Sequence, residues 1–263
     1  MTSDSPLTGR VALVTGVSRR MGIGMALARR LLADGARVFI QSWSPHDAEQ
    51  PWGSDPGGLE AVLTELGGVG DRLDHAAVDL GDPLAPGQVI DRVIDRFGAL
   101  DVLIANHARS SNQNLEQLTA DELDRSWAVN ARGSLLLVQR YAARHDDTRA
   151  GGRVVLFTSG QHLGPMASEL PYAVSKGAIH QMTASLADHL ADRGITVNAV
   201  NPGPTDTGWA TSTDLATMAG HLTAKRWGQP DDVANLVAFL ASDQSAWITG
   251  QVINSEGGFR RWG

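Results

Sequence analysis

The side chains of this sequence best suited to chemistry are a tyrosine and a lysine four residues apart, Tyr172 and Lys176. Residues four apart on a helix share a face, so the lysine ammonium would lie beside the phenol. The chain has only one other lysine, Lys225, against twenty arginines, and only one other tyrosine, Tyr141. Lysine differs from arginine in carrying a compact ammonium with three donors rather than a planar guanidinium. The pair therefore predicts proton transfer at a reacting oxygen. The alternative is that Tyr172 and Lys176 face solvent on a helix and take part in no reaction.

Two polar side chains upstream are candidates for the same site. Ser159 stands thirteen residues before Tyr172, at the end of a strand that begins with the apolar run Val154–Phe157. Thr158, directly before Ser159, is a weaker candidate. Asn130 stands within a predicted helix, where an asparagine alone usually marks a local distortion or an interhelical hydrogen bond.

A glycine-rich turn near the N-terminus predicts a phosphate site. The segment Val11–Gly24 runs from an apolar strand through glycines into a helix. Backbone amides at a helix N-terminus attract phosphate, and glycine lets the chain approach a pyrophosphate closely. The residues expected to contact a dinucleotide here are Gly16, Ser18, Arg19, Arg20, Gly22 and Ile23. A glycine turn that serves only packing is the alternative.

Apolar runs of strand length alternate with segments of helical periodicity along the whole chain. The predicted strands are Val11–Val14, Val38–Ile40, Ala76–Val78, Val102–Ala105, Val154–Phe157, Val197–Val200 and Val252–Ile253. The predicted helices are Met21–Leu32, Val89–Phe97, Ala120–Ala142, Ala173–Ala191 and Asp231–Leu240. Strands that are apolar at consecutive positions suit a parallel sheet covered on both faces. We therefore expect residues 1–263 to form a single Rossmann-type α/β domain with a doubly wound parallel sheet.

Two stretches interrupt this alternation. Residues 44–58 hold three prolines and three glycines and predict an extended loop. Residues 202–229 are rich in Thr, Gly and Ala. A segment of this length within a compact domain is often a substrate lid, although an irregular helical pair without a role in binding fits equally well.

Composition excludes several classes of function. The formal net charge is −7, so neither nucleic acid nor an anionic membrane is expected as a partner. There is no cysteine, which excludes disulfides, thiolate nucleophiles and zinc–sulfur sites. No histidine pair has metal-ligand spacing beside a carboxylate, so no catalytic metal is expected. The polar N-terminus resembles no targeting signal, and no apolar run approaches the roughly 20 residues of a membrane span, so a cytoplasmic protein is expected.

Taken together, these motifs resemble those of the classical short-chain dehydrogenase/reductase family. The family's loop T-G-x-x-x-G-x-G is present with two extra residues between Gly16 and Gly22, and V-N-x-x-G, Ser and Y-x-x-x-K follow in the family's order. The resemblance continues through a Pro-Gly motif at Pro202 to the C-terminal Gly257 and Gly258, and so covers essentially the whole chain. It implies a catalytic tetrad of Asn130, Ser159, Tyr172 and Lys176.

The resemblance also implies a bound nicotinamide dinucleotide. Its further contacts would come from Asp79, Leu80, Asn106, Tyr172, Lys176, Pro202, Gly203, Thr205 and Thr207, although Asp79 fits a helix N-cap equally well. NAD-preferring members carry an acidic residue at the end of the second strand, where this chain has Ser42. A 2′-phosphate could bind Ser42 together with Arg19 or Arg20, which favours NADP over NAD. Two solvated loop arginines are the alternative, and Trp43 rather than a basic residue follows Ser42.

The reaction implied is reversible transfer of hydride between the nicotinamide and a carbonyl carbon. By resemblance, Tyr172 would give the proton, Ser159 would hold the carbonyl oxygen, and Asn130 would anchor a water that relays protons from Lys176. A phenol pKa near 10 would have to fall to about 7, which requires roughly 4 kcal/mol of differential stabilisation from Lys176 and the positive nicotinamide ring.

The resemblance leaves the substrate open. We favour an NADPH-dependent ketoreductase similar to 3-oxoacyl thioester reductases. The family's enoyl reductases space their Tyr and Lys further apart, so the spacing of Tyr172 and Lys176 argues against an enoyl reductase. A non-catalytic nucleotide-sensing or scaffold protein with the same fold is the rival. The resemblance also implies a homotetramer built through the helices at 120–142 and 173–191.

Two histidines lie near the predicted site. Where the family has N-N-A-G after the fourth strand, this chain has Ala105-Asn106-His107-Ala108. Packing is the favoured role of His107, and a contact to ribose or substrate is the alternative. His162 either lines the mouth of the substrate site or is structural.

Overall fold

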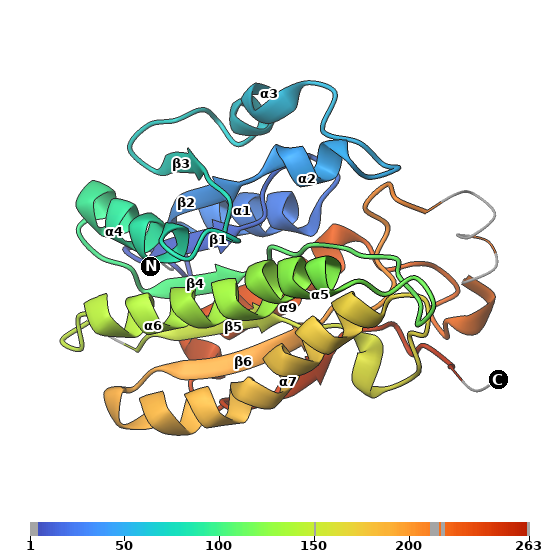
Figure 1. The fold of residues 1–263 in the computed structure, drawn as a ribbon. Helices are drawn as coiled ribbons and strands as arrows, with labels where there is room; N and C mark the ends of the chain where they lie inside the picture. The colour runs from blue at the N-terminus through green and yellow to red at the C-terminus, as the bar shows by residue number, and fades with distance from the viewer. Residues whose placement is uncertain (1–4, 150, 211–215, 217–218, 262–263) are drawn as a thin grey trace.

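The computed structural model describes residues 5–149, 151–210, 216 and 219–261. Its centre is a seven-stranded parallel sheet with the strand order β3-β2-β1-β4-β5-β6-β7 (Figure 1). The strands are β1 (Val11–Thr15), β2 (Arg37–Ser42), β3 (Leu73–Ala77), β4 (Val102–Ala105), β5 (Arg153–Phe157), β6 (Thr196–Asn201) and β7 (Val252–Asn254). This order confirms the predicted Rossmann-type doubly wound sheet.

Helices connect the strands. They are α1 (Ile23–Ala33), α2 (Ser44–Ala48), α3 (Gly58–Glu65), α4 (Ala85–Phe97), α5 (Ala120–Ser126), α6 (Ser134–Arg144), α7 (Leu170–Leu190) and α9 (Pro230–Ala241). A π-helical segment, Trp127–Gly133, joins α5 to α6, and single 3-10 turns occur at Gly160–His162, Ala191–Arg193 and Asp243–Ser245. Among the described residues, no helix combines the length and the apolar character needed to cross a lipid bilayer.

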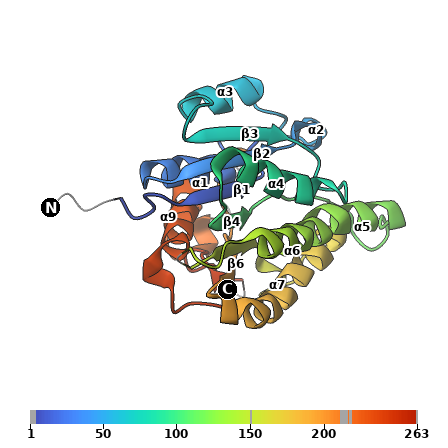
Figure 2. The same ribbon diagram turned by 90° about the vertical axis from the view of Figure 1, so that its left-hand side faces the viewer.

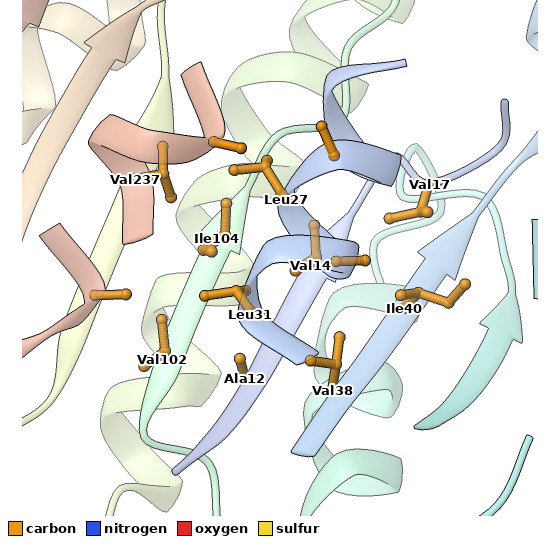
Figure 3. Close-up of a cluster of buried hydrophobic side chains, with 14 of the residues drawn as sticks. Ala12, Val14, Val17, Leu27, Leu31, Val38, Ile40, Val102, Ile104 and Val237 are labelled. Atoms are coloured by element: carbon orange, nitrogen blue, oxygen red, sulfur yellow. The ribbon is translucent and has the colours of Figure 1, made fainter. Parts of the chain in front are cut away.

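Side chains of β1 alternate between the two faces of the sheet, and both faces are buried. Ala12 and Val14 point into one core, which lies under α1 and α9 (Figure 3). Val11 and Leu13 point into the second core, under α4, α6 and α7 on the opposite side of the sheet (Figure 2). Because every residue of the central strands is covered, these strands are apolar at consecutive positions.

The parallel sheet brings the ends of its strands to one edge. Strand order reverses between β1 and β4, which are hydrogen-bonded neighbours. A crevice outside the carboxyl ends of the strands is expected at such a reversal. The segments that leave β1, β4, β5 and β6 at this edge carry most of the residues that the sequence identified as candidates.

The structure differs from the sequence prediction at three elements. The segment 44–58, predicted as an extended loop, begins with helix α2, whose first turn holds Pro45. Helix α3 was not predicted, although Leu59 recurs at helical spacing with Val62 and Leu63, which are buried. Strand β3 covers Leu73–Ala77 rather than Ala76–Val78, and its start was missed because this edge strand carries the polar residues Asp74 and His75, which interrupt the apolar run.

Candidate active site

A cleft of about 870 Å³ opens at the carboxyl edge of the sheet. Its lining comes from the segments that follow β1 to β6 and from the C-terminal residues after β7. A volume of this size is ample for an extended small molecule such as a dinucleotide.

The glycine turn after β1 forms one wall of this cleft. Gly16 has a positive φ of 73°, and a Cβ added to it would lie 2.7 Å from the Cα of His107. A Cβ on Gly24 would lie 2.3 Å from the carbonyl oxygen of Gly16. The Gln41 side chain braces the turn, because its Oε1 accepts from the Gly16 amide at 3.0 Å. Helix α1 starts after Gly22 without a side-chain cap, so its free amides face the cleft and suit a pyrophosphate.

Most residues predicted to bind the dinucleotide line the cleft. They are Gly16, Ser18, Arg19, Gly22, Ile23, Asp79, Leu80, Asn106, Tyr172, Lys176, Pro202, Gly203, Thr205 and Thr207. Asp79 does not cap a helix, since its carboxylate accepts from the Gly81 amide at 2.7 Å in a turn. Asn106 ties β4 to the glycine turn by donating to the carbonyl oxygens of Thr15 and Gly16.

Two predicted residues lie outside the cleft lining. Arg20 forms an ion pair with Asp55 at 2.9 Å, and this bond lowers the pKa of the Asp55 carboxyl to about 2. Ser42 is buried, with 1% of its surface exposed.

Arg19 remains in the cleft, and an unpredicted carboxylate lies near it. Its guanidinium donates to the carbonyl oxygen of Thr207 at 2.8 Å. Asp47, on α2, also lines the cleft and accepts from the Trp52 indole at 3.3 Å. Burial raises the pKa of the Asp47 carboxyl, while Trp52 and the Arg19 charge oppose that rise. This end of the cleft thus presents one cation and one anion.

Tyr172 and Ser159 meet in the cleft. Tyr172 lies in the first turn of α7, and Ser159 follows β5. Burial raises the pKa of Tyr172 to about 12, and a hydrogen bond with Ser159 opposes the rise. Thr158, the weaker candidate, instead donates its hydroxyl hydrogen to the carbonyl oxygen of Lys176 at 2.9 Å. Ser159 is therefore the hydroxyl available beside the phenol.

Lys176 is buried beneath this pair. Its ammonium donates to the carbonyl oxygen of Phe157 at 2.8 Å and lies 5.7 Å from the centre of the Tyr172 ring. Burial lowers the pKa of Lys176 to about 7. The sequence placed Lys176 beside Tyr172 by helical spacing, and the structure brings them together.

Asn130 lies behind the cleft rather than in it. It belongs to the π-helical segment and is fully buried. Its amide donates to the carbonyl oxygen of Arg109 at 3.0 Å and to the Ser175 hydroxyl at 2.9 Å, and its Oδ1 accepts from the Arg109 amide. Ser175 in turn donates to the carbonyl oxygen of Tyr172. These bonds connect Asn130 to the start of α7, and the predicted water relay stays a prediction.

The two histidines occupy different environments. His107 is buried, with Nδ1 2.7 Å from the Thr15 hydroxyl and Nε2 3.0 Å from the carbonyl oxygen of Val129. Burial lowers the pKa of His107 to about 3, so the imidazole is neutral and holds structure together. His162 is exposed, does not line the cleft, and packs edge-on against His180 with ring centres 4.4 Å apart.

The segment 202–229 contributes to one end of the cleft. Gly203 has a φ of 65°, and a Cβ there would lie 2.8 Å from the Cα of Glu256, so this turn packs against the C-terminal segment. Thr205 pairs with Gly228 in an isolated β-bridge that joins the two ends of the segment. Residues 211–215 and 217–218, the middle of the predicted lid, lie outside the described residues.

Several other residues that line the cleft were not predicted as site residues. Trp209 and Trp227 belong to the predicted lid segment 202–229. Arg109, Met166, Glu169, Glu256, Phe259 and Arg261 come from three further segments that only the folded chain assembles, so no local spacing marks them as a group. Within the described part of the chain, no cluster of three His, Asp or Glu side chains could hold a metal ion.

The arrangement combines a phosphate-binding turn with a proton donor. A phenol and a serine hydroxyl in one cleft, with a buried lysine beside the phenol, can supply a proton and a hydrogen bond to one oxygen atom. The glycine turn and the free amides of α1 fit a dinucleotide along the rest of the cleft.

Comparisons with known proteins agree with this geometry. A family profile described as enoyl-(acyl carrier protein) reductase matches residues 16–260. The uncharacterized oxidoreductase YjdA of Bacillus subtilis (strain 168) is 41% identical over 253 residues, which cover 96% of this chain and 97% of that protein.

Two solved structures are similar along the whole chain. A short-chain dehydrogenase from Burkholderia cenocepacia J2315 in complex with NADP has a TM-score of 0.83 at 35% identity, covering 96% of this chain and 98% of its own. The promiscuous reductase LugOII, which catalyses keto-reduction at C1 during lugdunomycin biosynthesis, has a TM-score of 0.82 at 37% identity, covering 97% and 98%.

Proposed function

The chain belongs to the short-chain dehydrogenase/reductase family of NAD(P)-dependent oxidoreductases, and we propose that it reduces a ketone to an alcohol with NADPH. The observation that carries the proposal is the pairing of the Tyr172 and Ser159 hydroxyls in the cleft, above the buried Lys176 ammonium. The keto-reduction performed by LugOII supports the same reaction class.

Each side chain has a separate task at the carbonyl oxygen. The nicotinamide, when bound, supplies hydride to the carbonyl carbon. Tyr172 donates its phenolic proton to the oxygen, and Ser159 donates a hydrogen bond that holds it. Burial raises the pKa of Tyr172 to about 12, the opposite direction from the fall to about 7 expected from the sequence, so the phenol holds its proton at neutral pH and its release has to be assisted. The Lys176 charge stabilises the phenolate that develops as the proton leaves.

Asn130 acts in this proposal through the backbone. It fixes the turn at Arg109 and, through Ser175, the first turn of α7, which carries Tyr172. The dinucleotide contacts proposed are the fourteen predicted residues that line the cleft.

Three residues, Arg19, Arg20 and Ser42, were expected to bind a 2′-phosphate, and of these Arg19 supports the preference for NADPH. Arg19 lines the cleft, whereas Arg20 is paired with Asp55 and Ser42 is buried. The NADP bound to the Burkholderia relative supports this choice. The Asp47 carboxylate opposes it, so we expect a moderate preference rather than an exclusive one.

The substrate is proposed as a ketone rather than an enoyl thioester. The matching profile is described as an enoyl reductase, but a four-residue spacing between Tyr172 and Lys176 differs from the wider spacing of the family's enoyl reductases. A 3-oxoacyl thioester is one subtype to include among test ketones.

The test begins with cofactor binding, which needs no choice of substrate. We expect NADPH to bind more tightly than NADH in a fluorescence titration, and a panel of ketones to be reduced with NADPH. Tyr172→Phe should lower kcat by at least about 100-fold while NADPH affinity changes by less than about twofold, since one proton donor and little contact area are lost.

The chain provides a matched control in its only other tyrosine. Tyr141 is buried in the second core and donates to the carbonyl oxygen of Asp101, so Tyr141→Phe should keep turnover. Unchanged turnover in Tyr172→Phe would remove Tyr172 from the mechanism. Tight cofactor binding without turnover of any ketone would favour the nucleotide-sensing or scaffold alternative.

A further inference from the structure

Glu169 stands next to the proposed proton donor without a structural task of its own. It precedes helix α7 and lies three residues before Tyr172, so the two side chains leave the same side of the first turn. Both line the cleft, and the Glu169 charge acts on the phenol, contributing to its raised pKa.

The carboxylate of Glu169 has no partner among the described residues. It does not cap α7, whose N-cap position forms no side-chain hydrogen bond, and it takes part in no ion pair within the described ranges. Its side chain is half-buried, and burial raises its pKa with no opposing contact. Removing a carboxylate from water without a partner is costly, so a partner from outside the chain would be stabilising.

The other charged side chains that line the cleft already have partners within the described residues. Arg109 binds Glu122 through two hydrogen bonds, of 2.9 and 2.8 Å. Glu256 pairs with Arg261 and accepts from the Asn201 amide at 2.7 Å. Glu169 is therefore the charged acceptor left open toward a ligand.

Apolar and aromatic side chains also line the cleft. Among them are Met166, Phe259, Trp209 and Trp227, and the last two rings pack edge-on with centres 5.3 Å apart. Such a lining favours a flat apolar body, and an open carboxylate in the same cleft favours a hydrogen-bond donor carried on that body.

We propose that Glu169 is a substrate-binding carboxylate, and that the ketone reduced by this protein is a ring compound bearing a hydroxyl or ammonium donor that Glu169 holds. This inference rests on the proposed ketone reduction. Binding of such a donor would also favour the reaction. A donor that neutralises Glu169 removes a negative charge from beside the carbonyl oxygen, which gains negative charge during hydride transfer.

The test uses matched ketones that differ in one group. The probes are 1-tetralone, its ring-hydroxylated isomers, their methyl ethers and the corresponding aminomethyl compounds, each assayed with NADPH. The methyl ether keeps the oxygen acceptor of the hydroxyl but cannot donate, and unsubstituted 1-tetralone controls for the added methyl group. We expect kcat/KM for the best hydroxyl or aminomethyl isomer to exceed that of its methyl ether or of 1-tetralone by about tenfold or more, chiefly through a lower KM.

Two substitutions separate the two kinds of donor. Glu169→Gln keeps a neutral acceptor, so it should abolish a preference for an ammonium and only weaken a preference for a hydroxyl. Glu169→Leu removes the acceptor and should abolish both. Glu116→Gln changes an exposed carboxylate elsewhere and should leave the preference as in the natural chain. Circular dichroism and the Tm of each variant establish that it is folded.

The outcomes distinguish this inference from the proposed function. If the natural chain reduces no ketone in this set or in the broader panel, the proposed reduction fails first. If it reduces 1-tetralone and the derivatives with the same kcat/KM, or if both Glu169 variants keep the donor preference, the substrate-binding role of Glu169 is overturned while ketone reduction stands.

Discussion

Lys176 sets the expected pH dependence of the free protein. Burial lowers the pKa of Lys176 to about 7, so its ammonium is largely charged at pH 6 and largely neutral at pH 8. The charged form stabilises both a developing phenolate and the anionic dinucleotide. We therefore expect kcat/KM for NADPH in ketone reduction to fall as pH rises through about 7, because this parameter reports groups of the free protein.

The control for this dependence removes the titrating group. Lys176→Met should lower kcat/KM at pH 6 and flatten the profile between pH 6 and 8, since no charge is then lost. A natural-chain profile that is flat over the same range would contradict the low pKa of Lys176.

Residue types and spacing were sufficient to identify the catalytic candidates but not every cofactor contact. Tyr172, Lys176 and Ser159 were predicted from one helix and one strand end, and the structure places them together. Arg20 was also predicted, but it binds Asp55, thirty-five residues away in a segment that was read as an extended loop. The partner of a charged side chain depends on which residues the fold brings near it. The sequence around Arg20 could therefore not show that Arg20 binds Asp55.

At the scale of elements, His107 joins three parts of the fold. Its ring connects the end of β1, through Thr15, to the carbonyl oxygen of Val129 in the π-helical segment. The bond to Val129 requires a hydrogen on Nε2, so Nδ1 accepts from the Thr15 hydroxyl. Val129 adjoins Asn130, and His107 thereby holds the segment from which Asn130 reaches Arg109 and α7.

Substitution of His107 tests this connection. His107→Ala places the family's usual residue at this position, but it removes two buried hydrogen bonds and leaves a cavity. We expect a loss of about 2–4 kcal/mol in the free energy of unfolding, measured by urea denaturation. His189→Ala, at an exposed position on α7, should change it by less than about 0.5 kcal/mol. A His107 variant as stable as the natural chain would show that the ring merely fills space.

The elements that the sequence missed have identifiable causes. Prolines and glycines in residues 44–58 predicted a loop, yet Pro45 lies in the first turn of α2, where a proline displaces no helical hydrogen bond. Helix α3 carried a usable signal, since Leu59, Val62, Leu63 and Leu66 recur at helical spacing and all pack on the first core. The π-helical segment carried one signal, because Asn130 within a predicted helix indicated a local distortion or an interhelical hydrogen bond.

For the whole molecule, alternation of strands and helices was sufficient to predict a parallel, doubly wound sheet. The position of each strand in the sheet was not predicted, because every central strand carries the same apolar pattern and order depends on how the crossovers pack. The cleft could be placed only once that order was known. Its lining includes Arg109 and Arg261, which are about 150 residues apart in the sequence.

The surface of the whole molecule bears on its assembly. Trp127, Leu135 and Val174 are 50%, 44% and 57% exposed, and they belong to the α5–α6 region and to α7, which lie side by side (Figure 2). Family resemblance implies that the helices of this region pair with those of another copy. Apolar side chains exposed together on neighbouring helices are consistent with such a contact.

We propose a homotetramer and expect light scattering to give about four times the chain mass of 27.9 kDa. The double substitution Leu135→Glu and Val174→Glu would place charges on the α6 and α7 surfaces and should reduce the mass to that of a dimer or monomer, because buried unpaired carboxylates oppose association. Val69 lies in the turn before β3 and is 53% exposed, similar to Leu135 and Val174. Val69→Glu should therefore leave the mass unchanged. A natural chain that elutes as a monomer would overturn the assembly, and a double variant that stays tetrameric would move the interface away from these helices.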